Sequence, residues 1–540
     1  MTCQEWTRRQ AIGRGGALIA GASGIAAAAP VLSRPPALSR PRVGPGPAER
    51  TATTTAGTSG TADTQLYWNF VSRPDLRPPI VTITKNGPFP GHEPGYLFIV
   101  PHGYPLTENG QPTGLMIMDW DGQVVWFLPP TQTADGVPLY TNTFGVQSYR
   151  GKPVLTWHVN QTSFGEAASL GYVTIADATY TPVASVSAVG GGFGADLHDC
   201  VLTSRGTAYT VVARMKTVDL TPIGGPTSAP VVDFGVQEID IATGNLLFQW
   251  DALDHIPLDE SYITYSSATP DLTDPYHLNS VAVAPDGNLL ISCRNTWTVY
   301  KVSRATGAII WRLGGKRSDF TMGPGAGFAW QHDVKPQGPG DTMLSIFDNE
   351  ATPQEAPQSR AIFLRLDTTR MRAWLLRAYT RPGGVLADNQ GSVQPLEGGQ
   401  VLVGWGARPY FTLFSPGGQV LLDGQFPDLG GTPDEVYQSY RTLSFPWSAT
   451  PTEAPAAAAR PGGADSSVVY ASWNGATEVA RWTVLAGPRP TALTQAGSHD
   501  RTGFETTIPV ASTGPYFTAV AEDAWGRELG RSAPVTLPAS

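Results

Sequence analysis

Residues 300–311 have the sequence YKVSRATGAIIW. Two apolar runs flank a short polar segment that ends at Gly307, and this pattern predicts two antiparallel strands joined by a tight turn. The same strand, turn and strand recurs at 116–126 (MIMDWDGQVVW), 237–248 (QEIDIATGNLLF) and 363–369, with weaker copies at 173–177 and 411–420. The chain therefore contains six predicted β-hairpins.

Single predicted strands stand between these hairpins, each after a turn rich in Gly or Asp: 152–157, 207–212, 288–292, 341–346 and 400–405. A hairpin with its neighbouring strands forms a sheet of about four strands, which cannot bury both of its faces alone. Six such sheets packed around an axis cover one another. We therefore predict an all-β fold in which residues 65–450 form a six-bladed β-propeller, with seven blades as the alternative count.

The composition changes after Pro446. Residues 451–465 are rich in Ala, Pro and Gly and are predicted to be a linker, and residues 466–540 contain alternating strands at 468–473, 479–484, 504–508 and 516–521. A Trp on an early strand and a Tyr on a late one resemble a fibronectin type III β-sandwich. Such a module is more often a spacer or binding unit than a catalyst, so we expect it to contact a surface or carbohydrate.

The first thirty residues are predicted to be an export signal. Arg8 and Arg9 precede a short, weakly apolar run from Gly16 to Ala29 that ends in small residues, as in a twin-arginine signal. Residues 31–64 are rich in Pro, Ala, Thr and Gly and are predicted to be a disordered linker. No later segment is apolar enough to span a membrane. We expect a secreted or cell-envelope protein.

The net charge argues against one class of partner, and the cysteine content leaves the presence of a disulfide open. The net charge of −9 argues against a nucleic-acid partner. Once Cys3 leaves with the signal, Cys200 and Cys293 remain. In an exported chain they could form a disulfide or stay as buried thiols, and the sequence favours neither.

Ionisable and amide side chains stand next to the predicted inner strands of successive blades. They are His198, His277, Asn279, Arg294 and His332. Because inner strands surround the axial channel, a histidine recurring just before them would place several imidazoles around one cavity. His92, His102, His255 and His499 lack this placement, and each is expected to be structural.

This set of residue types favours an anion over a metal ion. Zinc needs converging neutral ligands, and an arginine in the cluster would repel a cation. Arginine, histidine and asparagine together suit a tetrahedral anion, and a neutral imidazole can act as a nucleophile. The sequence contains no phosphate-binding loop of the Gly-x-x-x-x-Gly-Lys-Ser/Thr type. We predict no cofactor.

At these residues the sequence resembles the aryl sulfate sulfotransferases that do not use phosphoadenosine phosphosulfate. The matching segments are His198-Asp199, 277–281 (HLNSV), 292–296 (SCRNT), 310–315 (IWRLGG) and 328–333 (FAWQHD). The resemblance implies a six-bladed propeller and ping-pong transfer from an aryl sulfate donor to a phenolic acceptor through a sulfohistidine at His332. It implies that His198, His277, Asn279 and Arg294 bind the sulfuryl group or transfer protons.

Two further expectations concern the substrate and the competing functions. The donor ring is expected to pack against aromatic residues such as Trp157, Trp330 or Trp405. The alternatives are a metal-dependent hydrolase or lyase and a propeller that binds a ligand without catalysis.

Overall fold

The computed structural model describes residues 66–538 except 88–94, 105–111, 134–137, 165–166, 266–272, 339, 341 and 430–435. The predicted export signal (1–30) and linker (31–64) lie outside the described residues. All described residues belong to one compact unit, 64–540. No helix among them is long and apolar enough to cross a membrane.

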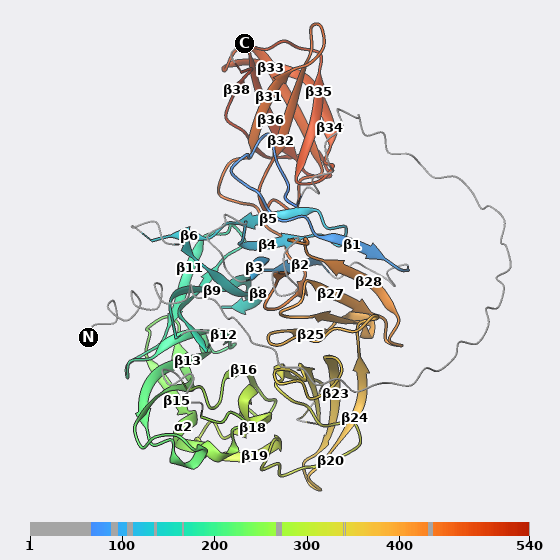
Figure 1. The fold of residues 1–540 in the computed structure, drawn as a ribbon. Helices are drawn as coiled ribbons and strands as arrows, with labels where there is room; N and C mark the ends of the chain where they lie inside the picture. The colour runs from blue at the N-terminus through green and yellow to red at the C-terminus, as the bar shows by residue number, and fades with distance from the viewer. Residues whose placement is uncertain are drawn as a thin grey trace, which may run out of the picture. The chain divides into compact units, whose positions relative to one another are not determined.

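Six groups of four antiparallel strands form the blades of a β-propeller, and Figure 1 shows them arranged in a ring. From the inside outward, blade 1 is β30 (Leu443–Phe445), β2 (Tyr96–Ile99), β4 (Leu115–Met118) and β5 (Val124–Leu128). Blade 2 is β8 (Thr141–Tyr149), β9 (Lys152–Phe164), β10 (Ala168–Ala176) and β11 (Pro182–Ser187), and blade 3 is β12 (Gly194–Leu202), β13 (Thr207–Val218), β14 (Ala229–Asp240) and β15 (Leu246–Asp251).

The remaining blades follow in chain order. Blade 4 is β16 (Leu278–Val283), β17 (Leu289–Cys293), β18 (Thr298–Val302) and β19 (Ile309–Gly314). Blade 5 is β21 (His332–Pro336), β22 (Met343–Asp348), β23 (Arg360–Asp367) and β24 (Arg372–Tyr379), and blade 6 is β25 (Ser392–Pro395), β26 (Val401–Gly404), β27 (Tyr410–Phe414) and β28 (Val420–Gln425). Each innermost strand contacts the next around the ring, in the order β8, β12, β16, β21, β25, β30 and back to β8. The predicted six blades are confirmed.

All six predicted hairpins form the outer two strands of a blade. In the hairpin at 300–311, the Gly307 N–H donates to the Ser303 carbonyl at 2.8 Å, and Gly307 has a φ of 73° that disfavours any residue with a Cβ. Blades 2 and 3 differ from the simple repeat because β10 also pairs with β12 and joins them into one eight-stranded sheet.

The ring is closed by strands from both ends of the propeller sequence. Strand β30, near its C-terminal end, pairs with β2 as the innermost strand of blade 1. Strand β1 (Thr82–Lys85) pairs with β28 at the outer edge of blade 6. The short pairs β3 (His102–Tyr104) with β29 (Val436–Gln438) and β6 (Thr131–Gln132) with β7 (Pro138–Leu139) lie outside the blades.

Neighbouring inner strands are connected by a repeated side-chain contact. The Asp199 carboxylate accepts the Val281 N–H at 3.1 Å, and the Ser280 hydroxyl accepts the Val334 N–H at 3.1 Å. In the same way, Asp333 accepts a backbone N–H from β25 at 3.0 Å. These contacts fix the height of one blade against the next, which determines where the residues before each inner strand lie.

The C-terminal residues form a β-sandwich of two sheets around one core. One sheet has the order β31 (Ala456–Pro461), β32 (Ser467–Ser472), β35 (Glu505–Val510), and the other has the order β34 (Ala492–Asp500), β33 (Arg481–Arg489), β36 (Tyr516–Glu522), β37 (Glu528–Arg531), with β38 (Val535–Thr536) on β36. The predicted linker at 451–465 differs from the structure because β31 lies within it. Its alanines have little strand propensity of their own and are held by pairing with β32. The resemblance to fibronectin type III stays a prediction.

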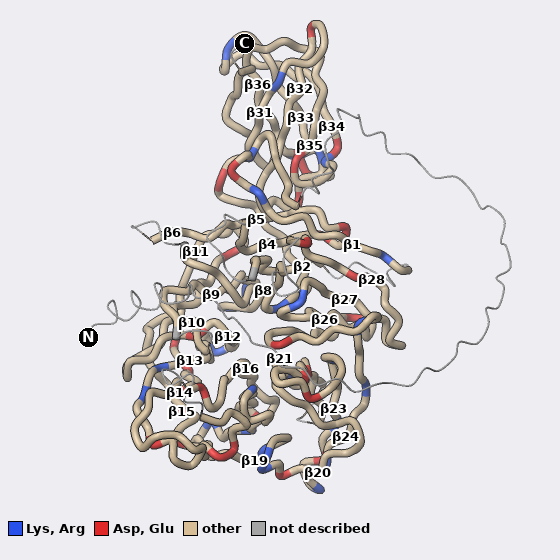
Figure 2. The backbone as a smooth tube through the Cα atoms, viewed as in Figure 1, with Lys and Arg blue, Asp and Glu red and all other residues tan. Residues whose placement is uncertain are grey.

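Figure 2 shows Lys and Arg interspersed with Asp and Glu along the described strands. The two predicted cysteines, Cys200 and Cys293, are free and buried, so the thiol alternative holds in this structure. Burial raises the pKa of the Cys200 thiol to about 12.

Candidate active site

A cavity of about 890 Å³ lies where the inner strands begin. Four of the five predicted site residues line it: His198, His277, Arg294 and His332. The ring centroids of His198 and His277 are 4.8 Å apart, and those of His277 and His332 are 6.4 Å apart. The structure therefore brings residues from blades 3, 4 and 5 into one cavity.

His332 is the first residue of β21 and is held by an amide. The Asn349 Nδ2 donates to two backbone carbonyls, of Ala387 and Gln390, both at 3.0 Å, and this fixes its Oδ1 toward the imidazole. His332 Nδ1 lies 2.8 Å from that Oδ1 and 3.2 Å from the Trp330 carbonyl. Both neighbours are acceptors, so Nδ1 carries the hydrogen and Nε2 keeps its lone pair, which accepts the Gln390 N–H at 3.2 Å.

Electrostatics keep this imidazole neutral. Burial, followed by the positive charge of Arg294, lowers the pKa of His332 well below the ordinary histidine value of 6.5. An unprotonated Nε2 is the form that can attack an electrophile.

His198 and His277 are paired with carboxylates instead. His198 Nδ1 donates to Asp196 Oδ1, and His277 Nδ1 donates to Asp274 Oδ2 at 2.6 Å. The backbone N–H groups of the two histidines also donate to the same carboxylates, at 3.1 and 2.8 Å. Each carboxylate therefore fixes the tautomer with hydrogen on Nδ1. Burial lowers the pKa of His277, and the Asp274 charge opposes that effect.

Arg294 begins the short helix η3 (Arg294–Thr296) and is half-buried. Its Nη1 donates to Asn295 Oδ1 at 2.9 Å and its Nη2 to the Asp388 carbonyl at 3.1 Å, while the guanidinium lies over the Trp330 ring at 4.8 Å. Burial lowers the pKa of Arg294 to about 10, so it stays charged at neutral pH. The Nε atom has no hydrogen-bond partner among the described residues, and a charged donor is thus available for an anion.

Asn279 does not line the cavity. It is fully buried in β16, where its Nδ2 donates to the Gln331 carbonyl at 2.6 Å. Ser280 makes the same contact to the next blade as Asp199 and Asp333, so Asn279 occupies the blade position of His198 and His332. The expectation of three histidines at equivalent positions is therefore wrong for His277, which lies two residues earlier and reaches the cavity through a backbone φ of 49°.

Sequence reasoning missed Tyr440, which lies between the histidines. Its ring centroid is 5.7 Å from that of His198 and 6.3 Å from that of His332, and its hydroxyl has no hydrogen-bond partner among the described residues. Burial raises the pKa of Tyr440, so the hydroxyl remains a donor. The partners Asp196 and Asp274 could have been found from their spacing of two and three residues before a histidine. Nothing local marks Tyr440 or Asn349.

The cavity wall is more polar than expected. Trp157, Trp330 and Trp405 do not line it, because all three are buried among apolar side chains or under Arg294. The wall instead contains polar residues from other blades: Asn142, Asp388, Asn389, Arg408 and Gln438. His102 makes the structural contact expected of it, because its Nδ1 lies 3.0 Å from the Val100 carbonyl. It also lines the cavity. His255 stacks on Trp250, and His92 lies outside the described residues.

Within the described part of the chain, no group of three or more His, Cys, Asp or Glu is arranged to hold a metal ion. The cavity instead offers a neutral imidazole, two carboxylate-paired imidazoles, a guanidinium and a phenol. These groups can bind a tetrahedral anion, attack its central atom and move a proton.

A comparison with protein families agrees with this chemistry. The family described as "Arylsulfotransferase (ASST)" matches residues 145–427, which is more than half of the chain and covers blades 2 to 6. The chain belongs to the arylsulfotransferase family. Its match contains His198, His277, Arg294 and His332, whereas Tyr440 lies beyond the matched residues.

Solved structures similar to this arylsulfotransferase share little sequence with it. A protein of unknown function from Bacteroides caccae is 11% identical, with 65% of this chain and 98% of that chain covered and a TM-score of 0.37. A streptogramin B lyase is 9% identical, with 64% and 88% covered and a TM-score of 0.32. Virginiamycin B lyase from Staphylococcus aureus is 10% identical, with 74% and 95% covered and a TM-score of 0.29. No curated protein matches the chain.

Proposed function

We propose that this arylsulfotransferase transfers a sulfuryl group from an aryl sulfate ester to a phenolic acceptor by a ping-pong mechanism through a sulfohistidine at His332. One observation carries the assignment of the nucleophile. Four histidines line the cavity, and His332 alone has its Nδ1 against a side-chain amide, while His198 and His277 face carboxylates. His102 has its Nδ1 against the Val100 carbonyl, but its Nε2 lies 3.2 Å from the Gln438 amide, and it is in ring contact with none of the other three histidines. An amide fixes the tautomer without favouring protonation, as a nucleophile requires, whereas a carboxylate stabilises the imidazolium, as an acid requires.

In the first half-reaction, the hydrogen bond from the Gln390 N–H to Nε2 of His332 breaks, and the freed lone pair attacks the sulfur of the donor. The N–S bond forms as the bond from sulfur to the aryl oxygen breaks, and the aryl oxygen takes a proton from the imidazolium of His198 or His277. Arg294 and the Tyr440 hydroxyl donate hydrogen bonds to the sulfuryl oxygens, whose charge they stabilise. The phenol leaves, and the sulfuryl group remains on His332.

In the second half-reaction, an acceptor phenol enters the cavity. The imidazole that lost its proton removes the phenolic proton, and the phenolate oxygen attacks sulfur. The N–S bond breaks, the new aryl sulfate leaves, and His332 returns to its neutral form. The polar wall that includes Asn142, Arg408 and Gln438 supports an acceptor with polar substituents on its ring.

The test uses 4-nitrophenyl sulfate with and without a second phenol. We expect nitrophenol release that depends on the acceptor, and with donor alone a gain in protein mass of one SO₃ group. Both are lost in His332→Ala, with a fall in rate of about 10³-fold or more. His499→Ala, on exposed β34, is the matched control. Release that is unchanged in His332→Ala, or that does not need an acceptor, contradicts the proposal.

We also infer that the enzyme acts outside the cytoplasm after twin-arginine export, and that its sandwich contacts a surface or carbohydrate. Arg8 and Arg9 support the first inference. Trp525, which is 78% exposed in the turn before β37, supports the second, because exposed aromatic rings pack on sugar faces. Replacing Arg8 and Arg9 with Lys should retain the protein in the cytoplasm, and normal export of this variant would contradict the inference.

A further inference from the structure

A second cavity, of about 370 Å³, lies in the axial channel, and we call it the distal chamber. At four of the five contributing inner strands, residues of the catalytic cavity come before residues of this chamber: Asn142 before Gln147, His277 before Val283, His332 before Pro336 and Tyr440 before Phe445. On β12 the order is mixed, because Asp196 lines the chamber before His198 lines the catalytic cavity, and Leu197 lines both. Inner strands of a propeller run the same way along its axis. The two cavities therefore lie toward opposite ends of the channel.

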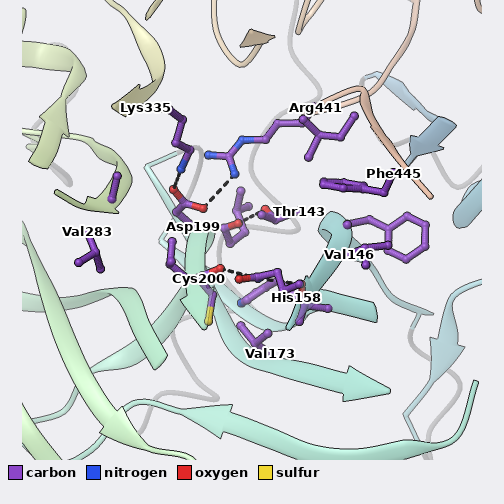
Figure 3. A pocket seen from close by; sticks show the side chains of 18 of the residues that line it. Thr143, Val146, His158, Val173, Asp199, Cys200, Val283, Lys335, Arg441 and Phe445 are labelled. Atoms are coloured by element: carbon purple, nitrogen blue, oxygen red, sulfur yellow. Dashed lines mark hydrogen bonds and ion pairs between the residues drawn. The ribbon is translucent and has the colours of Figure 1, made fainter. Parts of the chain in front are cut away.

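A charged layer separates them. Asp199 Oδ1 lies 2.9 Å from Arg441 Nη1, and Asp199 Oδ2 lies 2.7 Å from Lys335 Nζ; Figure 3 shows both cations reaching this carboxylate. Arg441 Nε also lies 3.4 Å from Asp333 Oδ1. Burial alone would raise the pKa of Asp199, but the charges of Arg441 and Lys335 lower it. Two cations thus face two carboxylates, and this end of the chamber has no excess positive charge to attract an anion.

The remaining wall is mainly apolar. It includes Phe144, Val146, Val173, Val283, Leu443 and Phe445. Figure 3 shows Val283 on one side and Val146 with Phe445 on the other. These three are only half-buried, so the chamber reaches solvent. Small-molecule sites have volumes of about 300–1,000 Å³ and mostly apolar walls, so a substituted single ring suits this chamber.

Three buried polar atoms of the lining residues have no hydrogen-bond partner among the described residues: Nε and Nη2 of Arg441 and Nδ1 of His158. Nε of Arg441 is ion-paired with Asp333, which leaves Nη2 and the His158 Nδ1. The His158 Nε2 lies 3.0 Å from the Ala195 carbonyl and donates to it, which leaves Nδ1 as an acceptor. Burial lowers the pKa of His158 to about 4, so the ring is neutral. One free donor and one free acceptor call for a group that can both accept and donate, such as a hydroxyl.

We propose that the distal chamber is a second small-molecule site, separate from the catalytic cavity, that binds a neutral aromatic alcohol of the phenol class. Its apolar wall takes the ring, its balanced charges select against an anion, and its unpartnered donor and acceptor select for a hydroxyl. The site needs no bond to form or break, so it is independent of the transfer reaction.

The probe is 4-bromophenol, whose bromine can be located by anomalous scattering in crystals of the full chain and whose binding can be titrated by calorimetry. Bromobenzene tests the hydroxyl, and 4-bromobenzenesulfonate tests the charge. We expect a bromine peak in the chamber for bromophenol and none there for the sulfonate. We expect bromobenzene to bind the chamber about 10- to 100-fold more weakly, as the loss of two hydrogen bonds predicts.

Val283→Trp fills the chamber without touching the catalytic cavity, and Val146→Trp does the same from the opposite wall. Val183→Trp, on the exposed strand β11, is the matched control. Thermal unfolding identifies any variant that fails to fold. We expect each filling variant to bind one bromophenol fewer per chain than the control, at unchanged catalytic-cavity occupancy in the crystal.

The outcomes separate this inference from the proposed function. If the catalytic cavity binds phenol, the control has two bromophenol sites and each filling variant has one. If the catalytic cavity binds no phenol, the control has one site and each filling variant has none. Both results support the chamber as a binding site. A bromine peak only in the catalytic cavity overturns the inference. So does a chamber peak at crystal concentration with no binding in solution, or an unchanged number of sites in both filling variants.

Discussion

Nδ1 of His332 lies 2.8 Å from Oδ1 of Asn349, and both side chains are buried. The amide holds the imidazole in the tautomer that leaves Nε2 unprotonated, and it does so without a negative charge. His198 and His277, the cavity histidines next to it, have carboxylates in this place. In the proposed mechanism, the residue behind each ring would distinguish the nucleophile from its acid partners.

Exchanging that amide for a carboxylate should move the pH profile. In Asn349→Asp the new charge stabilises the imidazolium and raises the pKa of His332 from its lowered value. The protonated form cannot attack, so the acidic limb of kcat/KM should move to higher pH by at least about one unit. Asn245→Asp, in an exposed turn, is the control. An acidic limb that stays in place would show that His332 is not the nucleophile.

Removing the Tyr440 hydroxyl should slow both half-reactions. Tyr440→Phe keeps the ring between His198 and His332 but loses the donor, so we expect kcat/KM to fall about tenfold or more, with no loss of stability because the hydroxyl has no protein partner. Steady-state kinetics with 4-nitrophenyl sulfate measure the effect, and Tyr470→Phe in the sandwich is the control. Unchanged kinetics would leave Tyr440 as a packing residue.

Replacing Arg294 by Lys should lower kcat/KM for the donor more than the same change at the surface does. Lys cannot make both hydrogen bonds to Asn295 and the Asp388 carbonyl, lie flat over Trp330 and still donate to the substrate. We expect kcat/KM for the donor to fall about 10- to 100-fold. The same change at exposed Arg481 should have no effect, and equal kinetics for the two variants would exclude a sulfuryl contact by Arg294.

Asn279→Ala should affect stability more than substrate binding. It removes the bond to the Gln331 carbonyl and leaves that buried oxygen unsatisfied, so the free energy of unfolding should fall by about 1–3 kcal/mol. Because Asn279 does not line the cavity, KM for the donor should stay within about twofold. A large rise in KM at unchanged stability would instead indicate that Asn279 reaches the substrate.

Buried histidines with lowered pKa values should make the protein sensitive to mild acid. The pKa of His158 is about 4 in the folded chain and 6.5 in the unfolded chain, so the unfolded state binds more protons between these values. The free energy of unfolding should therefore fall as pH drops from 6.5 toward 4, with a share from His158 of about 2–3 kcal/mol. His102, His277 and His332 also have lowered pKa values, so each of them lowers the free energy of unfolding further as the pH falls.

Chemical denaturation at pH 7.5 and 4.5 measures this loss. His158→Phe should reduce the difference between the two conditions, whereas His499→Ala should not. An equal difference in wild type and His158→Phe would contradict the lowered pKa.

The sequence alone determined the blades, because each hairpin is a local pattern: two apolar runs joined by a turn whose glycine can adopt a positive φ, as Gly307 does. It also identified four cavity residues, since polar side chains next to buried strands have few other reasons to be there. The local pattern at 451–465 predicted a linker and missed β31, because its alanines form a strand only through pairing with β32.

Only the tertiary structure decided how the site works. His277 rather than Asn279 enters the cavity because of the backbone turn at His277 and the contacts between blades. The spacing of residues along the sequence predicts neither the turn nor these contacts. Asn349 directly follows β22, the next strand of blade 5, and Tyr440 lies just before β30, the strand that closes the ring. A side chain's chemistry depends on what surrounds it, and in a propeller the neighbours of an axial residue come from blades that are far apart in the chain.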